Sequence, residues 1–179
     1  YAFGEGGSIT CKEETYHRHM TRLKNQGCDV RYYHDEVGFN YRLEGLQGAV
    51  LSVSLKYLPQ WTKRRQEIGW RYLREITNPL ITMQAHPDDT EPVFHLFVVQ
   101  VEERNGFVKY MADAGVECNL HYPVPCHLQK AYVRLGYKKG DCPNAEHLAE
   151  HCVTLPLFPE MQEWEIARVV ELCNCFDGA

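Results

Sequence analysis

The chain has 179 residues, 44% hydrophobic and 24% charged, which is enough for a globular core and excludes long disorder. Its formal net charge of -5 and pI near 6.0 argue against a nucleic-acid partner held by bulk electrostatics. No apolar run approaches the roughly 20 residues that span a bilayer, and no signal peptide is recognisable. We therefore expect a cytoplasmic protein with no nucleic-acid or membrane partner.

The N-terminal segment YAFGEGGSIT begins without Met and is typical of a turn followed by a strand that ends at residues 8–10. This start predicts that the chain is a fragment of a longer protein. The eight cysteines form no C-x-x-C pair. With no export signal, we expect reduced thiols that are mostly small buried hydrophobes.

Helical spacing dominates the next part of the chain. Residues 12–25 predict an amphipathic helix closed by Gly27, and a second helix is expected from about Leu43 to Leu58. Pro59 suits the first turn of a new helix, which then runs to Ile76. A helix with as few charges as 43–58 is expected to be buried against more than one neighbour.

After residue 80 the pattern changes to short strands. Strands are predicted at LITMQ (80–84), VFHLFVVQV (93–101) and VECNL (116–120), with a helix over 105–114 that ends at Gly115. Further helices are expected near 143–153 and 161–176. We therefore expect a division near residue 58: residues 1–58 as the tail of a larger domain, and 59–179 as a small α+β domain whose helices pack on one face of an antiparallel sheet.

Three short motifs carry little chemistry by themselves. HLAEH at 147–151 matches the H-x-x-E-H pattern of some zinc peptidases, but little chain remains for a downstream third ligand, so two exposed helix histidines without a metal are expected. His17 and His19 fall on different sides of a helix, which is poor geometry for a shared ion. GEGG at 4–7 lacks the wider G-x-G-x-x-G frame of nucleotide-binding loops.

Two loops carry residue patterns for which both a binding role and a structural role have to be considered. In HYPVPCH (121–127), two prolines stiffen the chain that carries His121, Tyr122 and His127, so a binding site and a purely structural role are about equally supported. In GFNYR (38–42), Asn40 can donate two hydrogen bonds to an anion, and Arg42 offers a planar fork for phosphate or carboxylate. The alternative is that Asn40 caps the helix and Arg42 pairs with Glu44.

Taken together, four stretches resemble the DegT/DnrJ/EryC1/StrS sugar aminotransferases, which are pyridoxal-phosphate (PLP) enzymes of fold type I. The stretches are GEGGSIT (4–10), GFNYRLEGLQGAVLSVSLKYL (38–58), HLFVVQVEERNGFVKYM (95–111) and residues 121–161, which begin HYPVPCHLQKAY. The resemblance covers essentially the whole chain. It implies an α/β fold in which the chain is the C-terminal part of a fold type I transferase.

The resemblance also implies roles for individual residues. Asn40 would bind the phosphate of PLP in the partner subunit of a homodimer with shared active sites, with Tyr41 and Arg42 beside it as substrate-binding residues. His121 and Tyr122 would line the nucleotide-sugar pocket, with His127 and, less directly, Gln129. The helix behind Asn40 would support the dimer interface.

The implied reaction moves an amino group from an amino acid, typically glutamate, to a keto sugar carried on a nucleoside diphosphate. The family's Schiff-base lysine precedes the G-[DE]-G-G turn, so it is expected upstream of Tyr1, and this chain alone is expected to be inactive. Gly45, Gly48 and Cys11 depart from the usual family residues without implying altered chemistry. The alternatives are a sugar dehydratase of the same fold and a non-catalytic homologue that binds nucleotide sugars.

Overall fold

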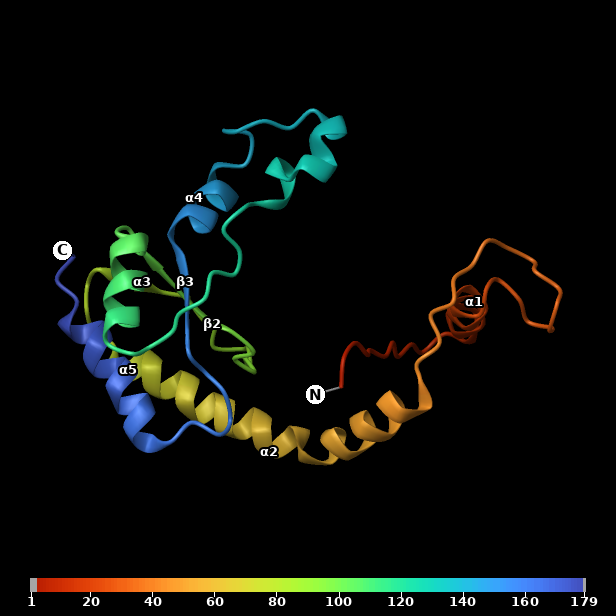
Figure 1. Ribbon diagram of the computed structural model, residues 1–179, viewed down its shortest axis with the longest axis horizontal. Coiled ribbons are helices and arrows are strands. Elements are labelled where there is room, and N and C mark those ends of the chain that lie inside the picture. Colours follow the sequence, from red (N-terminus) through yellow and green to blue (C-terminus); the bar gives the residue numbers. More distant parts are fainter. Residues whose placement is uncertain (1–2, 179) are drawn as a thin grey trace. The chain divides into compact units, whose positions relative to one another are not determined.

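A computed structural model describes residues 3–178 (Figure 1). The chain forms two compact units, Tyr1–Pro59 and Gln60–Ala179. The boundary between them lies inside the long helix α2, Gly45–Glu75. In the described part of the chain, no helix is both long and apolar enough to cross a membrane.

The first unit consists of helix α1, Glu14–Lys24, a long loop, and the first turns of α2. The loop returns alongside the end of α1: the Phe39 N–H donates to the Leu23 carbonyl at 2.7 Å, and the Tyr41 N–H donates to the Lys24 carbonyl at 2.9 Å. Gly27 and Gly38 make this return possible, because a Cβ on Gly38 would lie 2.1 Å from the Gly27 nitrogen. Backbone hydrogen bonds, rather than buried side chains, define this loop.

The second unit is built on a three-stranded antiparallel sheet in the order β1-β2-β3. The strands are β1, Ile81–Met83, β2, Phe97–Val101, and β3, Cys152–Leu155. The helices are α3, Arg104–Asp113, α4, Pro143–His151, and α5, Glu163–Cys175, with short 3-10 turns at Cys126–Leu128 and Lys130–Leu135.

The core covers one face of this sheet. Every second residue of β2 is buried, which is the alternation expected of a strand with one face against helices. The C-terminal half of α2, α3 and α5 supply the opposing apolar side chains, and Figure 1 shows α3 and α5 beside the strands. The central members of this core are Ile68, Tyr72, Phe97, Val99, Val101, Phe107, Met111, Ile166 and Val169.

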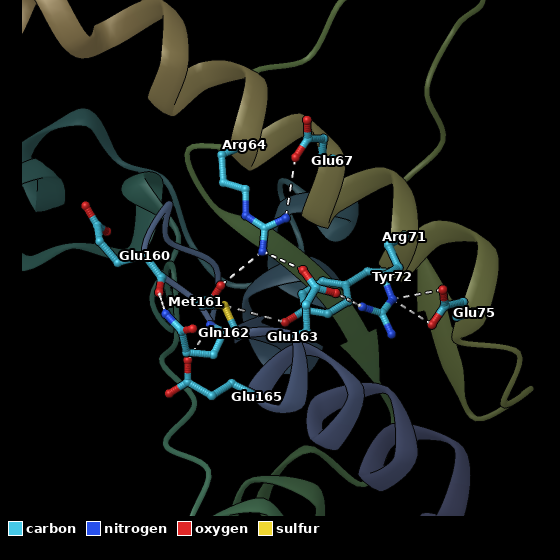
Figure 2. Close-up of polar contacts among 10 residues, drawn as sticks. All are labelled: Arg64, Glu67, Arg71, Tyr72, Glu75, Glu160, Met161, Gln162, Glu163 and Glu165. Atoms are coloured by element: carbon cyan, nitrogen blue, oxygen red, sulfur yellow. Dashed lines mark hydrogen bonds and ion pairs between the residues drawn. The ribbon is translucent and has the colours of Figure 1, made fainter.

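Polar contacts join α2 to the start of α5 (Figure 2). Both oxygens of the Glu163 carboxylate are paired, one with Arg64 and one with Arg71, each at 2.8 Å. The bond from Arg64, followed by the charges of both arginines, holds the pKa of Glu163 below its usual range. Nearby, the Tyr72 hydroxyl donates to the carbonyl of Pro156 at 2.9 Å. The sheet and these contacts position the loop that follows β3.

The structure confirms the small antiparallel sheet packed by helices and corrects several of its predicted elements. No strand forms at residues 8–10, because an extended segment becomes a strand only when another segment pairs with it, and no described segment does so. Pro59 does not start a new helix; it lies inside α2. Proline removes one helical hydrogen bond, but the helix-forming residues on both sides of Pro59 keep α2 continuous across the missing bond. The expected burial of residues 43–58 is also wrong, because none of the described residues of α2 in this range is buried.

The third strand of the sheet was misplaced by the sequence prediction. Residues 116–120 make only a single bridge, between Asn119 and Thr154, whereas the strand that pairs with β2 is Cys152–Leu155. A short apolar run directly after a helix cannot be told from the last helical turn by periodicity alone. The cysteines are all free, but only Cys28, Cys152 and Cys173 are buried, fewer than expected.

Candidate functional site

In the first unit, the loop residues Asn40, Tyr41 and Arg42 are all exposed. The rings of Phe39 and Tyr41 stack with centroids 4.9 Å apart. Since residues two apart on extended backbone point to the same side, this stacking leaves Asn40 on the opposite side. Asn40 forms an antiparallel bridge with Asn25, so its backbone is held in place.

The side chain of Asn40 is unpaired within the described residues, 3–178, where its carboxamide has no hydrogen-bond partner. It does not cap α2, which begins five positions later at Gly45. Arg42 does not pair with Glu44; its guanidinium donates to the Asn25 side-chain oxygen at 3.1 Å. The remaining N–H groups of Arg42 are left available. The loop therefore presents amide and guanidinium donors on a fixed backbone.

In the second unit, a cleft of about 330 Å³ is lined by the end of β3 and the residues that follow it, together with segments around His95 and Asn119. His121 is positioned there by a hydrogen bond of 2.8 Å between its Nδ1 and the Thr154 hydroxyl. Thr154 is itself fixed, because its backbone pairs with Val98 of β2 and with Asn119. The polar residues that line this cleft are His95, Glu117, Asn119, His121 and Thr154.

The arrangement leaves Nε2 of His121 as the ring nitrogen that can contact a ligand in the cleft. The ring of Tyr122 meets His121 edge to face, with centroids 5.1 Å apart, and its side chain is largely exposed. An imidazole held at one nitrogen by a buried hydroxyl can orient a sugar hydroxyl or a phosphate oxygen at the other. The structure thus brings His121 and Tyr122 together on one rigid support.

His127 is placed differently from His121. Its Nε2 lies 2.9 Å from the Glu146 carboxylate, and both side chains are only 9% exposed. Burial favours a raised pKa for Glu146, but the bond from His127 and the N–H groups of Gly140 and Cys142 outweigh it and lower the pKa. His127 therefore ties the 126–128 turn to α4, and its substrate-binding role stays a prediction. Gln129 is exposed and donates to the Val124 carbonyl at 3.4 Å.

Sequence reasoning missed Thr154, Asn119 and His95 as neighbours of His121. The available signal was the run CVTL, in which the β-branched residues Val153 and Thr154 favour a strand over a helix end. The separation of 33 positions between His121 and Thr154 explains the omission, because only the pairing of β3 brings them together.

Comparison with known proteins settles the family. The model of the DegT/DnrJ/EryC1/StrS aminotransferase family matches residues 1–174. The chain belongs to this family. Members of this family use PLP. The family match and the shared fold confirm the resemblance carried by GFNYR and HYPVPCH.

Relatives with assigned reactions are sugar transaminases. The chain is 39% identical over 169 residues to a dTDP-3-amino-3,6-dideoxy-alpha-D-galactopyranose transaminase of Aneurinibacillus thermoaerophilus. The matched region covers 94% of this chain and 46% of that relative. It is 32% identical over 169 residues to a UDP-N-acetyl-3-dehydro-alpha-D-glucosamine 3-aminotransferase of Acidithiobacillus ferrooxidans, covering 94% and 45%. The chain thus spans about half the length of these relatives.

A solved structure of S. venezuelae DesV, in complex with a ketimine intermediate, has the same fold over 97% of this chain and 47% of its own. The TM-score is 0.93 at 32% identity. The fold is therefore that of the C-terminal part of a PLP-dependent sugar aminotransferase, with its small antiparallel sheet.

Proposed function

We propose that the protein containing this chain is a PLP-dependent aminotransferase that converts a nucleotide-linked keto sugar to an amino sugar. The observation that carries the proposal is the family match over residues 1–174, together with relatives that are named transaminases of dTDP- and UDP-linked sugars. The proposed amino donor is glutamate. Residues 1–58 are proposed to belong to the large PLP-binding domain and residues 59–179 to form the small C-terminal domain.

The residues of the first unit fit a cofactor phosphate. Asn40 offers a carboxamide with no internal partner in the described chain, on backbone held by the pairing with Asn25. An amide that has no protein partner can donate to a phosphate oxygen without breaking an existing bond. We propose that Asn40 binds the phosphate of PLP in the partner subunit of a homodimer. PLP, when bound, supplies the electron sink for amino-group transfer.

Substrate-binding residues are proposed in each unit separately. Arg42 keeps free N–H groups and suits the diphosphate of the nucleotide, with Tyr41 beside it. His121, oriented by Thr154, would hold a polar group of the nucleotide sugar, and Tyr122 would provide an exposed aromatic face. The Schiff-base lysine is proposed to lie upstream of Tyr1 in the longer protein, so the 179-residue chain alone would be inactive.

The role of Asn40 is tested in the full-length protein by Asn40→Ala. Loss of a charge-assisted hydrogen bond of about 1.5 to 3 kcal/mol corresponds to PLP dissociation that is about tenfold to a hundredfold more favourable. Cofactor retention is measured by visible absorbance after dialysis. Asn144→Ala, which truncates another exposed asparagine, is the matched control and should retain PLP like the unaltered protein. Equal retention in both variants would remove Asn40 from the cofactor site.

The reaction is tested with the full-length protein, PLP, glutamate and dTDP- or UDP-linked keto sugars. Formation of an amino sugar with matching formation of 2-oxoglutarate supports the proposal. Loss of a sugar hydroxyl without amino transfer would instead assign a dehydratase of the same fold. Tight binding of the nucleotide sugar with neither reaction would assign a non-catalytic homologue.

A further inference from the structure

Three metal-ligating side chains converge where α4 ends: Glu102, His147 and His151. One ligand atom from each lies within 4.8 Å of the others. The Nε2 atom of His151 is 3.0 Å from a Glu102 oxygen, and the two histidine rings have centroids 4.2 Å apart. Tetrahedral zinc with bonds of about 2.1 Å separates its ligand atoms by about 3.4 Å. Small rotations of these side chains are therefore enough to enclose an ion.

Regular secondary structure creates this juxtaposition. His147 and His151 are four residues apart on α4, so they share one face of the helix. Helix α4 leads directly into β3, whose first residue, Cys152, pairs with Gln100 of β2 (Figure 1). The same register brings His151 beside the end of β2, which Glu102 follows immediately. The three ligands are held by a helix and a strand pair rather than by long loops.

The ring of His151 already has the orientation of a metal ligand. Its Nδ1 lies 2.8 Å from the carbonyl oxygen of His147, so the Nδ1–H donates to that carbonyl. This hydrogen bond leaves Nε2, which lies 3.0 Å from Glu102, as the ring nitrogen that can bind a metal ion in place of its contact with the carboxylate. Metal-binding histidines typically donate their other ring N–H to a carbonyl or carboxylate in this way.

From this geometry we infer that Glu102, His147 and His151 bind a divalent transition metal ion of the zinc type. Two imidazoles and one carboxylate suit zinc, whereas calcium and magnesium prefer oxygen ligands alone. A cavity of about 250 Å³ that includes Glu102 and His147 in its lining gives the ion an entry path and leaves room for a water as fourth ligand.

The site is assigned to binding and not to hydrolysis. The glutamate of the HLAEH motif, Glu150, pairs with Lys139 at 3.1 Å, so it is engaged elsewhere and does not serve as a base at the ion. The third ligand, Glu102, precedes the motif in the chain, whereas the H-x-x-E-H pattern predicts a ligand downstream of it. The inference does not depend on the aminotransferase activity.

His147 separates this site from a simple ion pair. Protonated His151 and Glu102 can pair without any metal, and this ion pair does not require His147. A bound metal ion, in contrast, would be coordinated by the His147 ring as well. The test is a calorimetric titration of the tag-free full chain with Zn²⁺, with and without His147→Ala. The unaltered chain should bind one more equivalent than the variant, or bind it at least about tenfold more tightly, since even outer-shell partners change metal affinity 10- to 100-fold.

Two further measurements keep the test decisive in a chain with eight free thiols. Glu102→Gln should reproduce the loss, and His17→Ala on α1 should bind Zn²⁺ like the unaltered chain. Co²⁺ should give visible d–d bands without the strong near-ultraviolet bands of thiolate ligands. Equal Zn²⁺ binding by the unaltered chain, His147→Ala and Glu102→Gln, or cobalt bound only through thiolates, would overturn the inference.

Discussion

The two units of the chain are stabilised in different ways. In the described part of the first unit, Cys28 is the only buried hydrophobic residue, and α1 buries no side chain. In the second unit, strand and helix residues form one continuous apolar core. Burial of apolar side chains is the main favourable contribution that offsets conformational entropy. The second unit is stabilised by its own apolar core, whereas the first depends on backbone hydrogen bonds and close glycine contacts.

This difference predicts that side-chain truncation acts strongly in the second unit and weakly in the first. Phe107 is fully buried and meets Phe176 edge to face at 5.0 Å. Phe107→Ala should lower the free energy of unfolding of this unit by about 3 to 5 kcal/mol. Urea titration followed by tryptophan fluorescence measures it, because Trp61, Trp70 and Trp164 all lie in the second unit.

Phe3→Ala is the matched control for the core substitution, since the Phe3 side chain is 76% exposed in the first unit. Its effect, followed by far-ultraviolet circular dichroism because this signal includes the helices of both units, should stay within about 0.5 kcal/mol. A comparable loss of stability from both variants would contradict the contrast between the two units.

Crowding of the backbone at the glycine contact should destabilise the first unit and leave the second unit unchanged. Gly38→Ala places a Cβ against the backbone of Gly27, and overpacking of this kind typically costs about 1 to 3 kcal/mol. The amide hydrogens of Gln26 and Phe39, which bond across this contact, should exchange faster, while the tryptophan transition stays unchanged. Gly7→Ala, with no atom near the added Cβ, is the control. Unchanged protection at both amides would show that the glycine contact is not what holds the loop.

The smallest expected effect concerns Glu163, whose pKa is lowered in the folded state by Arg64 and Arg71. A lowered folded pKa contributes stability above the unfolded value of about 4.5, and this contribution is lost as the pH falls through the folded pKa. Glu163→Gln should therefore lower the urea midpoint slightly at pH 7, and this difference from the unaltered chain should shrink as the pH falls below about 4.5. Glu160→Gln, at an exposed carboxylate nearby, should have no effect at either pH. A difference for Glu163→Gln that stays constant as the pH is lowered would exclude the ion pairs as its cause.

Local patterns in the sequence determined most of the helices and two of the three strands. The stops at Gly27 and Gly115 and the alternation of β2 could be recognised because they depend on neighbouring residues. Pro59 was misjudged because the helix-forming residues on both sides extend α2 across one missing hydrogen bond. β3 was misjudged because CVTL becomes a strand only by pairing with β2.

The sequence by itself determined the family of this protein, because the order and spacing of GFNYR and HYPVPCH are specific enough to identify it. The tertiary structure alone decided which side chains meet. The partnership of His121 with Thr154, the burial of His127 against Glu146 and the approach of Glu102 to His151 all join distant positions. These contacts follow from strand register and helix packing, which depend on the whole core rather than on the local pattern around each residue.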